Sequence, residues 1–265
     1  MMRLDYGAQL SPLPIKLSIG TLKKPKLRDI AEITFDKFNF FEVFLKITPK
    51  TYYEKIVENS EIWNNLSDEE KETVSIYQMI LLDSRLKDIY LELFNFFIVE
   101  KVIFVDGFFV VLNEGYTGDE PLKEEMIKGA IQENTFPQII GLMQQICCIY
   151  DKTEDEDEVK YKNDIARKIY EKILKGQKEN QKRKKGDKNL SIPNIISSVS
   201  NKHPSINYIN IWDLTIFQLL DAFNRLQANA IYEIDSARVS TWGDEKKTFD
   251  AALWYKNIYD NELTK

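Results

Sequence analysis

The chain has 265 residues, of which 43% are hydrophobic and 29% are charged, and its formal net charge is −6. These values are ordinary for a globular protein, and the length fits one large domain or two smaller ones with a buried core. One histidine and two cysteines exclude multi-histidine and four-cysteine metal sites and a disulfide framework.

The first part of the chain predicts a small β element followed by a helical region. Residues 15–19 alternate apolar and polar side chains, stop at Gly20 and resume at Thr21, as in a short hairpin or a strand with a loop. From about residue 27 to 45, apolar side chains recur every three or four positions. That spacing predicts helix.

Three capping signals predict the helices that follow. Thr48 and Pro49 form a cap with proline at the first helical position. Ser67 and Glu70 form a capping box, from which we expect a helix to about residue 82. Ser84 is a candidate cap for a helix through residue 97.

Asp106 and Gly107 give the clearest local signal in the chain. They separate two β-branched and aromatic runs, at 102–105 and 108–112. Asp-Gly between such runs predicts a hairpin, since a type I′ turn needs positive φ at both central residues. An amphipathic helix is predicted from about 136 to 150.

Charge divides the second half of the chain. Residues 151–158 carry a net charge of −5, and residues 160–188 carry +8. We therefore predict a helical portion at 1–150, a charged helix and linker at 151–190, and a second helical portion at 191–265.

The C-terminal portion predicts a long helix. Asp213 is its candidate cap, and apolar residues repeat on one face until Gly243, with Ile234 the last of them. Asp244 is a candidate start for a final helix. The predicted fold class is mainly α with a small β component, formed by the N-terminal strand element and the hairpin near 102–112.

Enzyme signatures are missing from the sequence. It has no Gly-rich phosphate loop, HExxH, GxSxG or calcium-loop motif. His203 follows a short helix without an identifiable partner, which favours a surface or locally hydrogen-bonded histidine over a general base. We expect no enzyme activity, catalytic residue, cofactor or metal site. We also expect no membrane span, since no apolar run approaches ~20 residues.

Two sets of residues are candidates for binding. Phe40 and Phe44 lie off the main apolar stripe of the 27–45 region, so they are either core or a surface for a protein partner. The basic tract at 167–188 is a candidate for polyanions, with Lys182, Arg183, Lys184 and Lys185 at its centre. A solvated charged helix and linker is the favoured alternative for that tract.

Two segments resemble a known family. LSPLPIKLSIGTLKKPKLRDIAEITFDKFNFFEVFL near the start resembles the opening of small proteins encoded in phage tail gene clusters. The closing segment from VSNKHPSINYINIWDL to ALWYKNIYD resembles the ends of tail-assembly-chaperone-like proteins of viruses of Gram-positive bacteria. The resemblance covers roughly 11–150 and 189–260 and implies binding to tape-measure or tail subunits in the cytoplasm of the infected host. It assigns no role to an individual residue.

Three functions remain as hypotheses. The first is a non-enzymatic chaperone or adaptor in phage tail assembly. The second is a structural component of the tail or baseplate in the virion, which the unusual length of the chain keeps open. The third is a nucleic-acid-binding or host-directed regulatory protein that uses the basic tract.

Overall fold

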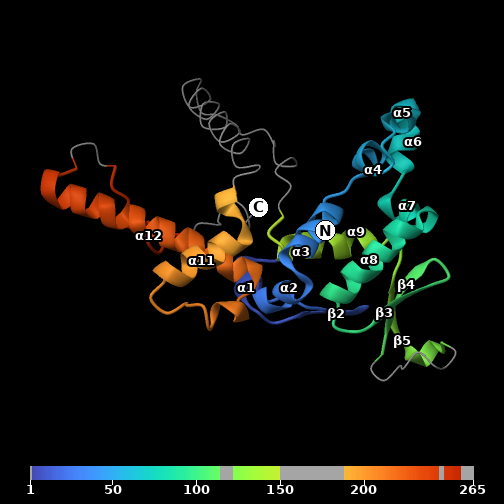
Figure 1. Ribbon diagram of the computed structural model, residues 1–265, viewed down its shortest axis with the longest axis horizontal. Helices are drawn as coiled ribbons and strands as arrows, with labels where there is room; N and C mark the ends of the chain where they lie inside the picture. The colour runs from blue at the N-terminus through green and yellow to red at the C-terminus, as the bar shows by residue number, and fades with distance from the viewer. Residues whose placement is uncertain (1, 114–121, 150–187, 245–247, 258–265) are drawn as a thin grey trace. The chain divides into compact units, whose positions relative to one another are not determined.

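The computed structural model describes residues 2–113, 122–149, 188–244 and 248–257. These residues form two compact units (Figure 1). Unit 1 consists of the described residues within Met1–Ile149 and Trp212–Gln218 together with Asn257, and unit 2 consists of those within Tyr150–Ile211 and Leu219–Lys256. The described residues are mainly helical and include two small antiparallel sheets, which confirms the predicted fold class.

Most of unit 1 is formed by the elements from α1 to α9. In chain order its elements are α1 (Tyr6–Leu10), β1 (Ile15–Leu17), β2 (Gly20–Leu22), α2 (Leu27–Ile33), α3 (Phe35–Leu45), α4 (Pro49–Lys55), α5 (Ser60–Asn65), α6 (Asp68–Thr73), α7 (Ile76–Leu82), α8 (Ser84–Phe97), β3 (Val102–Val105), β4 (Phe108–Leu112), η1 (Glu124–Met126), β5 (Ile127–Ile131) and α9 (Phe136–Ile146).

Both predicted β elements are confirmed. Strands β1 and β2 pair as a hairpin, and β3 pairs with β4 in register across the Asp106-Gly107 turn. Asp106 has φ 49° and Gly107 has φ 85°, the positive values that a type I′ turn requires.

A third strand, β5, pairs antiparallel with β4 and was not predicted. Its residue Gly129 lies against the β1–β2 turn, where a Cβ would meet the Cα of Ile19 at 2.5 Å. Only glycine leaves room for that close approach of two backbones. The same glycine lowers the β propensity of the segment, which is why the sequence did not predict this strand.

Aromatic rings from four elements fill the core of unit 1. Tyr90 and Phe94 on α8 meet Phe109 on β4 and Phe136 on α9, with ring centroids 4.8 Å apart for Phe94–Phe109 and 5.4 Å for Tyr90–Phe136. Tyr77 on α7 joins them and donates its hydroxyl hydrogen to the carbonyl oxygen of Ile131 at 3.0 Å. The aromatic richness of the chain therefore serves first to build this core.

The predicted helical region at 27–45 is interrupted. Thr34 has φ 73° and separates α2 from α3, and its hydroxyl oxygen accepts from the backbone N–H of Lys37 at 3.3 Å to cap α3. The apolar spacing continues across this break, so periodicity alone could not locate it.

The helix predicted to run from Ser67 to about residue 82 is also interrupted. The capping box is confirmed, with the backbone N–H of Glu70 donating to the Ser67 hydroxyl at 3.2 Å. However, α6 ends at Thr73, and α7 begins after a second cap at Ser75. The helices at 49–55 and 136–146 form with proline at their first turn as expected. The cap of α8 is Asp83 instead of Ser84.

Two helices dominate the C-terminal part: α11 (Ile192–Lys202) and α12 (Ile216–Trp242), with 3-10 turns η2 (Lys188–Leu190) and η3 (Ile211–Asp213) before them. The prediction that Asp213 caps α12 was wrong, because Asp213 forms ion pairs with Arg28 at 2.5 Å and Lys26 at 3.4 Å. Thr215 and Gln218 cap the helix reciprocally. Gly243, at φ 75°, follows its end as predicted.

The final helix expected from Asp244 does not form in the described residues. Residues 251–255 form turns. In the described ranges, none of the helices is both long and apolar enough to cross a membrane.

Candidate partner-binding surfaces

Helix α3 carries an exposed apolar pair in unit 1. Phe40 is 44% exposed and Val43 is 58% exposed, one helical turn apart, and we call this pair the α3 surface. Phe44 is only 5% exposed; it lies between Phe40, at 4.7 Å between ring centroids, and Tyr90 of α8. Of the two phenylalanines singled out from the sequence, Phe40 lies on the surface and Phe44 lies in the core.

The C-terminal end of α3 is fixed by side chains from two other helices. Tyr90 of α8 donates its hydroxyl hydrogen to the Phe44 carbonyl at 2.9 Å, and Gln144 of α9 donates its amide hydrogen to the Leu45 carbonyl at 2.6 Å. These bonds satisfy carbonyl groups that a helix end leaves without intrahelical partners. The α3 surface is thus presented by a helix with little freedom to move.

Lysines three residues before Phe40 and three residues after Val43 form ion pairs. Lys37 pairs with Glu92 at 2.9 Å, and Lys46 pairs with Glu42 at 3.7 Å. Burial raises the pKa of Glu42, while the neighbouring Lys46 acts in the opposite direction. An apolar centre with a polar margin is the usual anatomy of a protein–protein interface.

Helix α12 carries a second apolar surface in unit 2. Ile231 is 53% exposed, Ile234 is 69% exposed and Trp242 is 81% exposed, and we call these residues the α12 surface. The periodicity had placed residues such as Ile234 on one face of this helix, but that face is not buried over its second half.

Residues 248–257, which we call the returning segment, cover a different side of α12. Tyr232 packs on Phe249 with ring centroids 5.6 Å apart, and Arg225 donates to the Lys256 carbonyl at 2.7 Å. At 100° per residue, Arg225 and Tyr232 lie well away from Ile231 and Ile234 around the helix. The returning segment therefore leaves the α12 surface uncovered.

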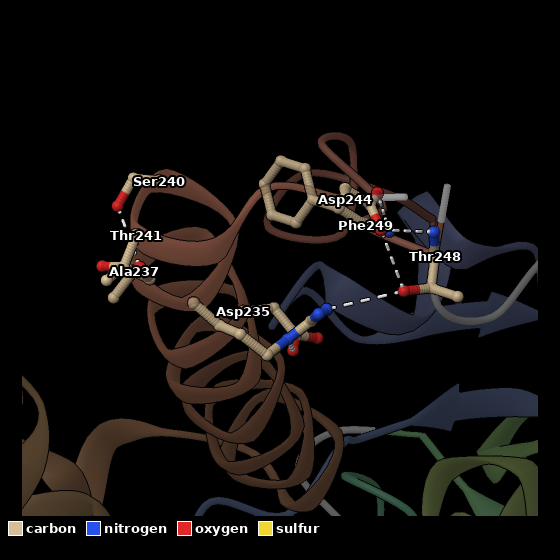
Figure 2. Close-up of polar contacts among 8 residues, drawn as sticks. Asp235, Ala237, Ser240, Thr241, Asp244, Thr248 and Phe249 are labelled. Carbon is tan, nitrogen blue, oxygen red and sulfur yellow. Dashed lines mark hydrogen bonds and ion pairs between the residues drawn. The ribbon is translucent and has the colours of Figure 1, made fainter. Parts of the chain in front are cut away.

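Polar contacts hold the returning segment at the end of α12 (Figure 2). The Asp244 carboxylate accepts from the backbone N–H of Phe249 at 2.9 Å and of Thr248 at 3.0 Å, and these bonds lower the pKa of Asp244. Arg238 pairs with Asp235 at 3.2 Å and also reaches the Thr248 hydroxyl at 3.5 Å. Asp244 was predicted to start a helix, but its carboxylate instead binds the backbone N–H groups of a non-helical segment.

His203 has a local structural role. Its Nδ1 accepts from the backbone N–H of Ile206 at 3.0 Å and of Ser205 at 3.2 Å, so the ring stabilises the turn that follows α11. This is the locally hydrogen-bonded arrangement that the sequence favoured over a general base.

The other candidate set lies outside the described residues. Lys182, Arg183, Lys184 and Lys185 fall there, as does the acidic run at 151–158. Within the ranges that the structure does describe, no group of three or more His, Cys, Asp or Glu side chains is placed to hold a metal ion.

Comparison with models of known protein families gives a match to part of the chain. Residues 180–259 match the family model described as the YomV second domain. The matched range is less than a third of the chain. The match suggests a phage-derived protein family. Neither the curated proteins nor the solved structures yield a match to this chain. The matched range includes α11, the α12 surface and the four basic residues.

Proposed function

We propose that the chain is a non-enzymatic phage tail-assembly protein that binds tape-measure or tail subunits in the cytoplasm of the infected host. The observation that carries the proposal is the α3 surface, an exposed aromatic and aliphatic pair on a helix that is fixed at its C-terminal end. The match to the YomV second domain supports the phage context, since it covers the part of the chain where the sequence also resembles tail-assembly proteins.

Rigid presentation favours binding. Residues that are already ordered lose little conformational freedom on association, so more of the apolar contact appears as affinity. Phe40 and Val43 would form the apolar centre of the contact, and the ion pairs of Lys37 and Lys46 its polar margin. A structural role in the virion uses the same surface and differs in whether the chain stays with the particle.

Affinity purification of the tagged chain from infected cells tests the proposal. We expect tape-measure or tail subunits to be recovered with the wild-type chain. The double variant Phe40→Ser with Val43→Ser should lose them, because it removes the apolar centre of the contact. Leu82→Ser is the matched control, since Leu82 is 88% exposed and lies outside the α3 surface.

The outcomes separate the hypotheses. Recovery of no tail protein by the wild-type chain would overturn the proposal, and so would equal recovery by the double variant. Detection of the chain in purified particles would assign it to the virion, whereas its absence there would favour a chaperone that leaves after assembly.

A further inference from the structure

Helix α12 presents a stripe of six side chains with an unusual symmetry. Its members are Phe223, Gln227, Ile231, Ile234, Arg238 and Trp242, which follow one another at intervals of 4, 4, 3, 4 and 4 residues. At 100° per residue they fall within an arc of about 100°, and at 1.5 Å per residue they span about 28 Å. Reversing the chain direction leaves these intervals unchanged.

The side chains follow the same symmetry as the spacing. An aromatic residue stands at each end, an isoleucine stands on each side of the midpoint, and a long polar side chain lies between them in each half. Phe223 is half-buried, and the residues of the α12 surface are exposed. A two-fold axis at the midpoint would place Phe223 opposite Trp242 and Ile231 opposite Ile234.

We propose that α12 is a self-association surface that pairs antiparallel with the α12 of a second copy of this chain. A two-fold interface must be self-complementary, because each surface meets its own copy in reverse. The stripe meets that requirement at every position. The pairing is independent of tail-protein binding, since it uses a different unit of the chain.

Charge favours the antiparallel arrangement over a parallel one. In a parallel pair in register, Arg238 of each copy would face the other, which places two like charges together. In the antiparallel pair, Arg238 faces Gln227 of the second copy, whose amide oxygen can accept from the guanidinium. Arg238 is exposed, and it is held in position by Asp235 at 3.2 Å and by the Thr248 hydroxyl at 3.5 Å.

Sedimentation velocity of the full chain over a wide range of concentration tests the proposal. We expect a reversible monomer–dimer equilibrium. Ile234→Asp should weaken the dimer by roughly a hundredfold or more, because each copy would bury a carboxylate against Ile231. Asn229→Asp is the matched control: it adds the same charge to an exposed position about 170° around the helix from the centre of the stripe, and the dimer should persist.

Two substitutions at Gln227 test the direction of pairing. Gln227→Glu should tighten the dimer by roughly threefold to tenfold, since it faces Arg238 twice in the antiparallel pair, whereas Gln227→Arg should weaken it. Weakening by both variants would indicate a parallel pair and overturn the proposal. A chain that stays monomeric at every concentration, or a dimer that Ile234→Asp does not affect, would also overturn it. Circular dichroism should show unchanged helix content in each variant, so that loss of the dimer reports the interface.

Discussion

The contrast between Phe40 and Phe44 yields a quantitative prediction about α3. Phe44 is 5% exposed and Phe40 is 44% exposed, so substitution by alanine removes different amounts of buried surface. With about 200 Å² for a phenylalanine side chain and about 25 cal/mol per Å², Phe44 buries roughly 190 Å² and Phe40 roughly 110 Å². Because the unfolded chain is already partly collapsed, we expect losses of about 4 and about 2 kcal/mol, respectively.

Equilibrium urea denaturation followed by far-ultraviolet circular dichroism measures both losses. The slope of the free energy of unfolding against urea should be unchanged, so the shift in midpoint reports stability. The reasoning would be refuted if Phe40→Ala cost as much as Phe44→Ala, because Phe40 would then be a core residue and the α3 surface would lose its aromatic member.

Two further predictions concern the sheets of unit 1. Burial raises the pKa of Glu100, but hydrogen bonds, first among them one from Lys128, outweigh it and lower the pKa to about 2. The ionised Glu100 therefore stabilises the fold above its ordinary pKa near 4.5, and this contribution is lost as the pH falls toward 2. Glu100→Gln should cost about 1–3 kcal/mol of stability at neutral pH. The variant should also flatten the dependence of the urea midpoint on pH between 4.5 and 2. An unchanged pH dependence would contradict this. Gly129→Ala should cost about 1–3 kcal/mol in the same assay, since its Cβ would meet Ile19 at 2.5 Å, and a neutral effect would show that the two backbones do not approach so closely.

Local sequence signals predicted local structure well. The Asp106-Gly107 turn and the Ser67 capping box depend on residues a few positions apart, so the sequence contains everything that specifies them. The break at Thr34 carries no such signal, because a positive φ is uncommon for threonine. Asp213 pairs with Arg28, 185 residues away, so its role depends on tertiary structure.

The candidate site was predictable only in part. Aromatic density around α3 identified an interaction helix as an alternative to core, but nearly every face of the helix is apolar, so spacing could not separate Phe40 from Phe44. What separates them is Tyr90 on α8, which covers Phe44 and leaves Phe40 outside. The α12 surface was missed for the opposite reason: its periodicity is that of a buried face, and periodicity does not reveal whether a partner element exists.

Photo-crosslinking in infected cells tests the central claim most directly. A photoreactive amino acid replaces Val43 in the full chain, and a second chain carries it in place of Leu82, which is also exposed but lies outside the α3 surface. We predict that the Val43 position crosslinks to a tape-measure or tail subunit, identified by mass spectrometry, and that the Leu82 position does not. The absence of a tail protein among the products from position 43, or equal crosslinking from both positions, would contradict the claim.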